Sequence, residues 1–137
     1  MEKIKLDMGQ KAYRLGGGVL RFNPADPNVY DRFSKLPQKL KELESQLGMR
    51  RDADPVSQLV EADRELKAML GWVFGPGNDF DAMVEGMNLL AVAGNGKSLL
   101  ANLLDALEPM MVKGAEVCAN AAREEALRKA RERRGEV

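Results

Sequence analysis

The sequence predicts a mainly α-helical fold with a small β element at its amino terminus. A β pattern is confined to residues 1–23, and apolar residues recur at steps of three and four through residues 26–122. Such steps place apolar side chains on one face of a helix. Residues 123–137 are charged and rich in alanine. We therefore expect a single domain, residues 1–137, in which a bundle of about four helices carries a two- or three-stranded hairpin and a long charged carboxy-terminal helix.

The β pattern consists of short apolar runs around three glycines. Ile4 and Leu6 alternate with charged residues, and the runs 12–15 and 19–22 flank Gly16-Gly17-Gly18. Glycine allows the positive φ angles of a tight hairpin turn. An isolated hairpin is only marginally stable, so these strands are expected to lie on the helices or to pair with another subunit.

Two Asp-Pro pairs mark the starts of the first two helices. Asp26-Pro27 and Asp54-Pro55 each combine a preferred N-cap residue with a proline at the first helical position. An apolar seam runs through residues 29–47, and Pro37 inside it predicts a kink or a split into two helices. Residues 49–53 are polar and basic, which predicts a loop.

The second helix is predicted to end at Gly75-Pro76-Gly77, which is a strong break. Asp63 is the one polar residue that intrudes on its apolar stripe. Asn78 or Asp79 is expected to cap a short third helix. The apolar residues of that third helix are Phe80, Met83, Val84 and Met87.

The fourth helix is the apolar element around which the chain is organised. We expect it to run from about Lys97 towards Arg134, with a bend near Glu108 because Pro109 interrupts it. Its apolar stripe is predicted to pack on the second helix. The residues expected in this contact are Leu103, Leu104 and Leu107 on the fourth helix and Leu59, Leu66 and Leu70 on the second.

The composition argues against most classes of enzyme. The 137 residues include 21 basic and 21 acidic side chains, no histidine and one cysteine, Cys118. Histidine is the commonest general base and metal ligand near neutral pH, so cysteine–histidine catalysis, serine–histidine catalysis and ordinary zinc sites are excluded. We expect no cofactor. The sequence shows neither a long apolar run nor a charged-then-apolar leader, which predicts no membrane span and no signal peptide and favours the cytoplasm.

Gly96-Lys97-Ser98 before a helix resembles the end of a phosphate-binding loop. A complete loop has a further glycine five residues earlier, after a β-strand, so that successive N–H groups surround a phosphate. Here that position is Ala91, and the residues before it lie between predicted helices. We predict a glycine loop that binds no nucleotide, with Lys97 in solvent and Ser98 or Asn95 capping the next helix.

Two groups of side chains are candidates for binding a partner. Methionine is common on surfaces that accept partners, although it also fills gaps in cores. The first group is Trp72, Phe74, Met83, Met87, Met110 and Met111. The second group is Arg123, Arg128 and Arg131, in a basic segment that is either a solvated helix or one that orders on a partner. The glutamates in this segment and its lack of aromatic residues argue against nucleic acid as that partner.

The order of several short segments resembles one protein family. Residues 21–27 read Arg-Phe-Asn-Pro-Ala-Asp-Pro, and residues 72–77 read Trp-Val-Phe-Gly-Pro-Gly. Residues 91–97 read Ala-Val-Ala-Gly-Asn-Gly-Lys, and Ala-Leu-Glu-Pro-Met follows before an end rich in alanine and arginine. Roughly over residues 20–134, this order resembles the small tail assembly chaperones of long-tailed, siphovirus-like bacteriophages and prophages of Gram-positive hosts.

The resemblance implies a non-enzymatic role in the cytoplasm of the host bacterium. Such a chaperone binds the tape measure protein and keeps it soluble until the tail tube protein polymerises around it. We also expect self-association, and contact with the tail tube protein. A different class stays open: a small helical adaptor or regulator of phage origin that binds another protein or nucleic acid. An enzyme that uses carboxylate or lysine chemistry is the third hypothesis.

Overall fold

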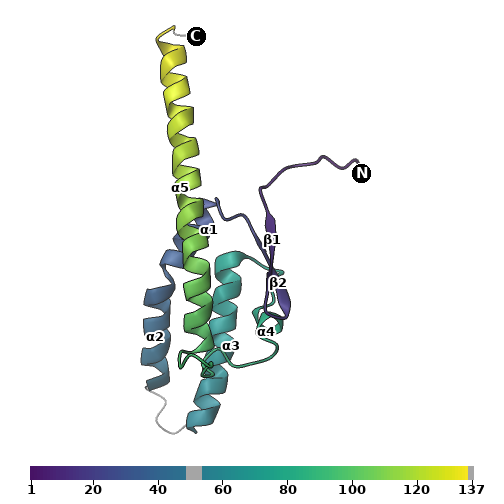
Figure 1. The fold of residues 1–137 in the computed structure, drawn as a ribbon, viewed down its shortest axis with the longest axis vertical. Coiled ribbons are helices and arrows are strands. Elements are labelled where there is room, and N and C mark those ends of the chain that lie inside the picture. Colours follow the sequence, from purple (N-terminus) through teal and green to yellow (C-terminus); the bar gives the residue numbers. More distant parts are fainter. Residues whose placement is uncertain (49–53, 136–137) are drawn as a thin grey trace.

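The computed structural model of the chain describes residues 1–48 and 54–135. Its elements are β1 (Lys11–Leu15), β2 (Gly18–Phe22), α1 (Pro27–Ser34), α2 (Leu36–Gly48), α3 (Pro55–Phe74), α4 (Phe80–Met83) and α5 (Leu99–Arg133). Helices α2 and α3 flank the first half of α5, and the second half of α5 projects beyond the body (Figure 1). The predicted mainly α fold with an amino-terminal hairpin is confirmed. The loop predicted at 49–53 lies outside the described residues.

The helix starts follow the predicted caps. The Asp26 carboxylate accepts a hydrogen bond from the Asn28 N–H at 2.9 Å, and the Asp54 carboxylate accepts one from the Ser57 N–H at 3.3 Å. A proline follows each cap in the first turn. The predicted split around Pro37 is also confirmed, because α1 ends at Ser34 and α2 begins at Leu36.

The three glycines let the tip of the hairpin lie against α4. Gly16 has a φ of +55°, and a Cβ on it would lie 2.0 Å from the Met83 carbonyl oxygen. The Gly17 N–H donates to that same oxygen at 3.0 Å. Only glycine fits this approach, so the glycine run serves both the turn and its contact with α4.

The hairpin has two strands, β1 and β2, paired antiparallel. The β pattern around Ile4 and Leu6 does not form a third strand, because residues 1–10 carry no secondary structure. The Ile4 and Leu6 side chains are 93% and 76% exposed. Within residues 1–48 and 54–135 no strand lies beside that segment, which is why it forms no ladder.

Phe74 is the centre of the hydrophobic core. Its ring lies 5.0 Å from that of Phe22 in β2, 5.8 Å from that of Phe80 in α4 and 6.3 Å from that of Phe33 in α1, measured between centroids. Aromatic rings at these separations attract one another beyond their burial alone. One side chain at the end of α3 therefore joins the hairpin to three helices.

Helix α5 is continuous from Leu99 to Arg133 and is not interrupted at Pro109. Leu103 and Leu107 are buried in the same cluster as Leu66 and Leu70 of α3, as predicted.

Two residues of the predicted contact between the second and fourth helices behave differently. Leu104 is only partly buried at the edge of the cluster. Leu59 is 48% exposed, so its predicted place under the fourth helix is wrong. Val56 and Val60 are also exposed, which shows that the first turns of α3 do not face the core.

Helix α4 is shorter than predicted. It runs from Phe80 to Met83, and its N-cap is Asp79, whose carboxylate accepts from the Ala82 N–H at 3.0 Å. Glu85 and Gly86 have φ angles of +54° and +77°, which a right-handed helix does not contain. Met87 therefore lies beyond the helix in which it was predicted.

Candidate functional site

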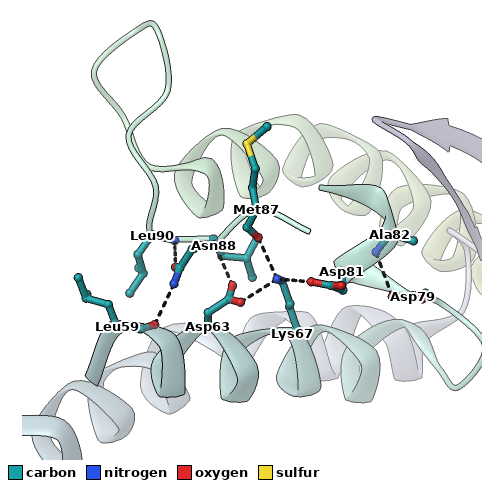
Figure 2. Close-up of polar contacts among 10 residues, drawn as sticks. Leu59, Asp63, Lys67, Asp79, Asp81, Ala82, Met87, Asn88 and Leu90 are labelled. Atoms are coloured by element: carbon teal, nitrogen blue, oxygen red, sulfur yellow. Dashed lines mark hydrogen bonds and ion pairs between the residues drawn. The ribbon is translucent and has the colours of Figure 1, made fainter. Parts of the chain in front are cut away.

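A largely buried lysine ties the segment after α4 to α3. Lys67 Nζ donates to Asp63 Oδ2 at 2.7 Å, to Asp81 Oδ1 at 2.6 Å and to the Met87 carbonyl oxygen at 2.9 Å (Figure 2). The Lys67 side chain is 12% exposed. Asp63 Oδ1 also accepts from the Leu89 N–H at 2.7 Å. The polar intrusion of Asp63 on the stripe of α3 therefore holds a chain segment that has no regular secondary structure.

The charge on Lys67 is stabilised by its neighbours. Burial disfavours the charged form, but hydrogen bonds and attraction from Asp63 and Asp81 outweigh burial and raise the pKa of Lys67 above its ordinary value. The ammonium group therefore stays charged throughout the neutral range. These contacts satisfy all three of its donor hydrogens, which indicates a structural role.

The glycine loop between the Lys67 network and α5 uses the N–H groups of Ala93, Gly96 and Lys97 internally. The Ala93 N–H donates to the Lys97 carbonyl oxygen at 2.8 Å, and the Gly96 N–H donates to the Ala93 carbonyl oxygen at 2.9 Å. Lys97 Nζ lies 3.1 Å from Asp105 Oδ2, with both side chains more than half exposed. Ser98 caps α5 as predicted, because its hydroxyl accepts from the Ala101 N–H at 3.1 Å. That the loop binds no nucleotide stays a prediction.

Three of the candidate partner-binding residues belong to the core. Phe74, Met83 and Met111 are 4%, 2% and 0% exposed. Their predicted place on an exposed binding surface is wrong, because none of the three exposes more than 4% of its surface. Phe74 is enclosed by aromatic rings, and Met83 packs against the hairpin tip at Gly18.

The other three apolar candidates lie on separate elements. Trp72 on α3 is 43% exposed, and Lys39 Nζ lies over its ring at 4.6 Å from the centroid. Met87 is 51% exposed in the segment after α4, and Met110 is half-buried on α5. The structure therefore does not gather Trp72, Met87 and Met110 into one site.

The arginine candidates lie on the projecting part of α5. Arg123, Arg128 and Arg131 are exposed. Arg128 forms an ion pair with Glu125 at 2.6 Å, one helical turn away. At 3.6 residues per turn the three positions fall within about 140° of one another around the helix axis. We call this side of the helix, which also carries Glu124, the basic face.

Two apolar grooves lie along the middle of α5. The first, the α1–α5 groove, has a volume of about 300 Å³. Its lining residues are Tyr30, Phe33, Ser34, Leu36, Pro37, Leu40, Leu104, Glu108, Met111 and Val112. Most of these side chains are apolar or aromatic, so the α1–α5 groove suits apolar side chains of a partner.

The second groove, the hairpin groove, has a volume of about 550 Å³ and lies between β1 and α5. Its lining residues are Gly9, Lys11, Tyr13, Asn23, Pro24, Ala25, Met110, Lys113, Gly114 and Val117. Of the sequence candidates only Met110 and the buried Met111 line either groove. Tyr30, Val112 and Val117 were missed, because an exposed apolar residue at helical spacing looks like a core residue in the sequence.

The chain was compared with protein families, curated proteins and solved structures, and none of them matches it. Within the described residues, no helix combines the length and the apolar character needed to cross a bilayer. Over the same residues, no group of three or more cysteine or acidic side chains is arranged to hold a metal ion. The functional interpretation below uses the two grooves and the basic face.

Proposed function

We propose that this protein is a tail assembly chaperone of a long-tailed bacteriophage or prophage, which binds the tape measure protein and keeps it soluble while the tail tube assembles. The observation that carries the proposal is the α1–α5 groove, an apolar channel along α5. The resemblance of the sequence to that family supplies the identity of the partner. The role is non-enzymatic and belongs to the cytoplasm of the host bacterium.

The α1–α5 groove suits a helical or extended apolar segment better than a folded domain. A partner helix would place side chains three and four residues apart into such a groove. A volume of about 300 Å³ holds only a few such side chains. Tyr30 and Val112 in its lining are 40% and 45% exposed. This modest apolar surface fits a chaperone that must release its partner, because a large patch would cause aggregation.

Co-expression with overlapping fragments of the tape measure protein from the same phage or prophage genome tests this proposal. A fragment that is insoluble alone should become soluble and co-purify with the wild-type chain. Val112→Asp should lose the fragment, because binding would bury a charge in the α1–α5 groove. Val92→Asp is the matched control, since Val92 is 77% exposed on the glycine loop and lines neither groove.

Failure of every fragment to become soluble or to co-purify would overturn the proposal. If Val112→Asp binds as well as Val92→Asp, the α1–α5 groove is not the binding site. Binding of RNA or DNA by the wild-type chain, without binding of any tape measure fragment, would instead support the adaptor or regulator of phage origin.

A further inference from the structure

One edge of the hairpin is open. The two-residue turn at 16–17 makes Leu15 and Gly18 a hydrogen-bonded pair, and in an antiparallel ladder every second pair is of this kind. Ala12 and Arg14 fall between such pairs, so their N–H and C=O groups point away from β2. No hydrogen bond within residues 1–48 and 54–135 reaches these four groups. The outer side of β1 can therefore accept another strand.

The opposite edge of the hairpin is occupied at Arg21. Asn78 Oδ1 accepts from the Arg21 N–H at 2.8 Å, and Asn78 Nδ2 donates to the Arg21 carbonyl oxygen at 2.9 Å. The side chain of Asn78 thus imitates one residue of a neighbouring strand. The bond from the Gly17 N–H to the Met83 carbonyl oxygen also fixes the hairpin tip to α4. On the β2 edge the outward groups of Arg21 are thus satisfied by Asn78, whereas on the β1 edge those of both Ala12 and Arg14 are open.

The amino-terminal arm, residues 1–8, has the pattern of a strand without a partner. Its apolar residues Ile4, Leu6 and Met8 alternate with charged residues and are 93%, 76% and 59% exposed. The arm leaves the body beside β1 and points away from it (Figure 1). A period of two gives a strand with one apolar face and one charged face.

The root of the arm is held in place. The Asn23 side-chain amide donates to the Met8 carbonyl oxygen at 2.9 Å, and the Gly9 N–H donates to Asp7 Oδ1 at 2.9 Å. Gly9 has a φ of +65°, which turns the chain before β1 begins. These contacts direct the arm away from the β1 of its own chain.

We propose that the amino-terminal arm adds as a third strand to the open β1 edge of a second copy of this chain, and that the second copy returns its own arm. Ile4, Leu6 and Met8 would then cover the hairpin groove, which lies beside β1 on the side of α5. The same molecule carries both the strand and the edge that receives it. This inference does not depend on the proposed binding of a tape measure protein.

The length and the area of the arm fit this exchange. Eight extended residues reach roughly 26–29 Å, which exceeds the roughly 17 Å of a five-residue strand such as β1. An unfolded peptide of about 1,000 Da exposes roughly 1,450 Å². Burial of half of that surface on each of two exchanged arms gives roughly 1,400 Å² from the arms alone, within the range of about 1,200–2,000 Å² for stable interfaces.

Sedimentation equilibrium of the full chain over a range of concentrations, with three variants, tests the exchange. The double variant Ile4→Lys/Leu6→Lys removes the apolar face of the arm, and Ala12→Pro removes an outward N–H of β1 without breaking a bond to β2. The arm variant should weaken self-association by at least about tenfold, the change expected when apolar side chains leave an interface. Ala12→Pro should also weaken it, because the added strand loses a hydrogen-bond donor of β1. Val92→Lys adds a charge at an exposed valine elsewhere and should associate like the wild type.

Amide hydrogen–deuterium exchange on the same samples distinguishes a dimer with swapped arms from other dimers. The amides of Ala12 and Arg14 should become protected as the protein concentration rises, together with amides of the arm. A monomeric wild-type chain would overturn the proposal, as would a dimer that all three variants preserve. Protection of Ala12 and Arg14 at every concentration in a monomer would show that the arm folds back on its own β1, which also overturns it. The arm variant lies wholly in exposed residues, so its result holds even if Ala12→Pro fails to fold.

Discussion

Gly114 illustrates, at the level of a single residue, how packing can require what helix propensity disfavours. Glycine inside a helix costs about 1 kcal/mol relative to alanine. A Cβ at Gly114, however, would lie 1.6 Å from the Pro24 carbonyl oxygen and 2.5 Å from the Pro24 carbonyl carbon. These are backbone atoms, so no side-chain rotation can relieve the contact. Helix α5 approaches the turn before α1 this closely only because residue 114 has no side chain.

Gly114→Ala should lower the free energy of unfolding by about 1–3 kcal/mol, because the overpacking outweighs the gain in helix propensity. Gly71→Ala is the control, since no atom outside its own helix lies within 4 Å of the added methyl group. That control should stabilise the protein by up to about 1 kcal/mol. Urea denaturation of both variants measures the difference. Stabilisation by both substitutions would contradict the close approach of α5 to Pro24.

Periodicity identified apolar residues but not the direction that each one faces. Trp72 and Phe74 were grouped together in the sequence, yet Trp72 is 43% exposed and Phe74 is 4% exposed. Residues two positions apart in a helix differ by about 200° around its axis, so Trp72 and Phe74 face opposite ways. The polar intrusion at Asp63 was visible in the sequence. Its contact with the Leu89 N–H, 26 residues away, was not, because it arises only from the tertiary arrangement.

At the level of elements, the Lys67 network fixes the position of a segment that has no regular secondary structure. The segment 84–98 has no helix and only an isolated bridge between Val92 and Ser98. Its start is held by Lys67 at the Met87 carbonyl oxygen and by Asp63 at the Leu89 N–H. Leu89 is thereby fixed in the core, where it is 0% exposed. The network thus positions the chain that leads into α5.

Lys67→Met should lower the free energy of unfolding by about 2–3 kcal/mol, because it leaves the largely buried Asp63 without its cation. The exposed ion pair of Lys97 provides the control, and Lys97→Ala should change stability by less than about 0.5 kcal/mol. Urea denaturation at neutral pH compares the two. A loss as small as that of Lys97→Ala would show that the network does not contribute to stability.

The raised pKa of Lys67 also predicts a dependence on pH. A raised pKa in the folded state means that its stabilisation is complete below the ordinary value of 10.5 and is lost as the pH rises through the higher folded-state value. Wild-type protein should therefore lose more stability than Lys67→Met between neutral pH and strongly alkaline pH. Denaturation curves of the two proteins at both pH values measure this difference. Equal losses of stability in the two proteins would exclude a contribution of the Lys67 charge to the pH dependence.

The elements with local signals were predictable, and those that depend on distant contacts were not. The caps at Asp26 and Asp54 and the break at Gly75 are written within four residues of sequence, and the structure confirms them. The end of α4 depends on a left-handed backbone conformation at Glu85. Glutamate, unlike glycine, does not indicate that conformation in a sequence. The arm at residues 1–8 has a strand pattern, but a strand requires a paired neighbour, and no strand of the described residues pairs with the arm.

For the whole molecule, the main division is between the packed body and the projecting end of α5. The helix has 35 residues, which corresponds to a length of roughly 50 Å. Its buried residues end at Gly114. Beyond that point the helix is supported by its own backbone and by pairs such as Arg128–Glu125, each of which contributes only about 0.2–0.5 kcal/mol. The projecting end therefore adds little to the stability of the body.

Deletion of residues 120–137 should change the free energy of unfolding by less than about 0.5 kcal/mol, because exposed residues contribute little. From Ala119 to Gly135 every described residue is exposed except Ala130, which is half-buried. The same deletion should reduce co-purification of a tape measure fragment, because it removes the basic face of Arg123, Arg128 and Arg131. Urea denaturation and the co-expression assay measure the two effects on one variant. A large loss of stability would show that the end of α5 packs against another part of the protein or a second copy, and unchanged co-purification would exclude the three arginines as contacts.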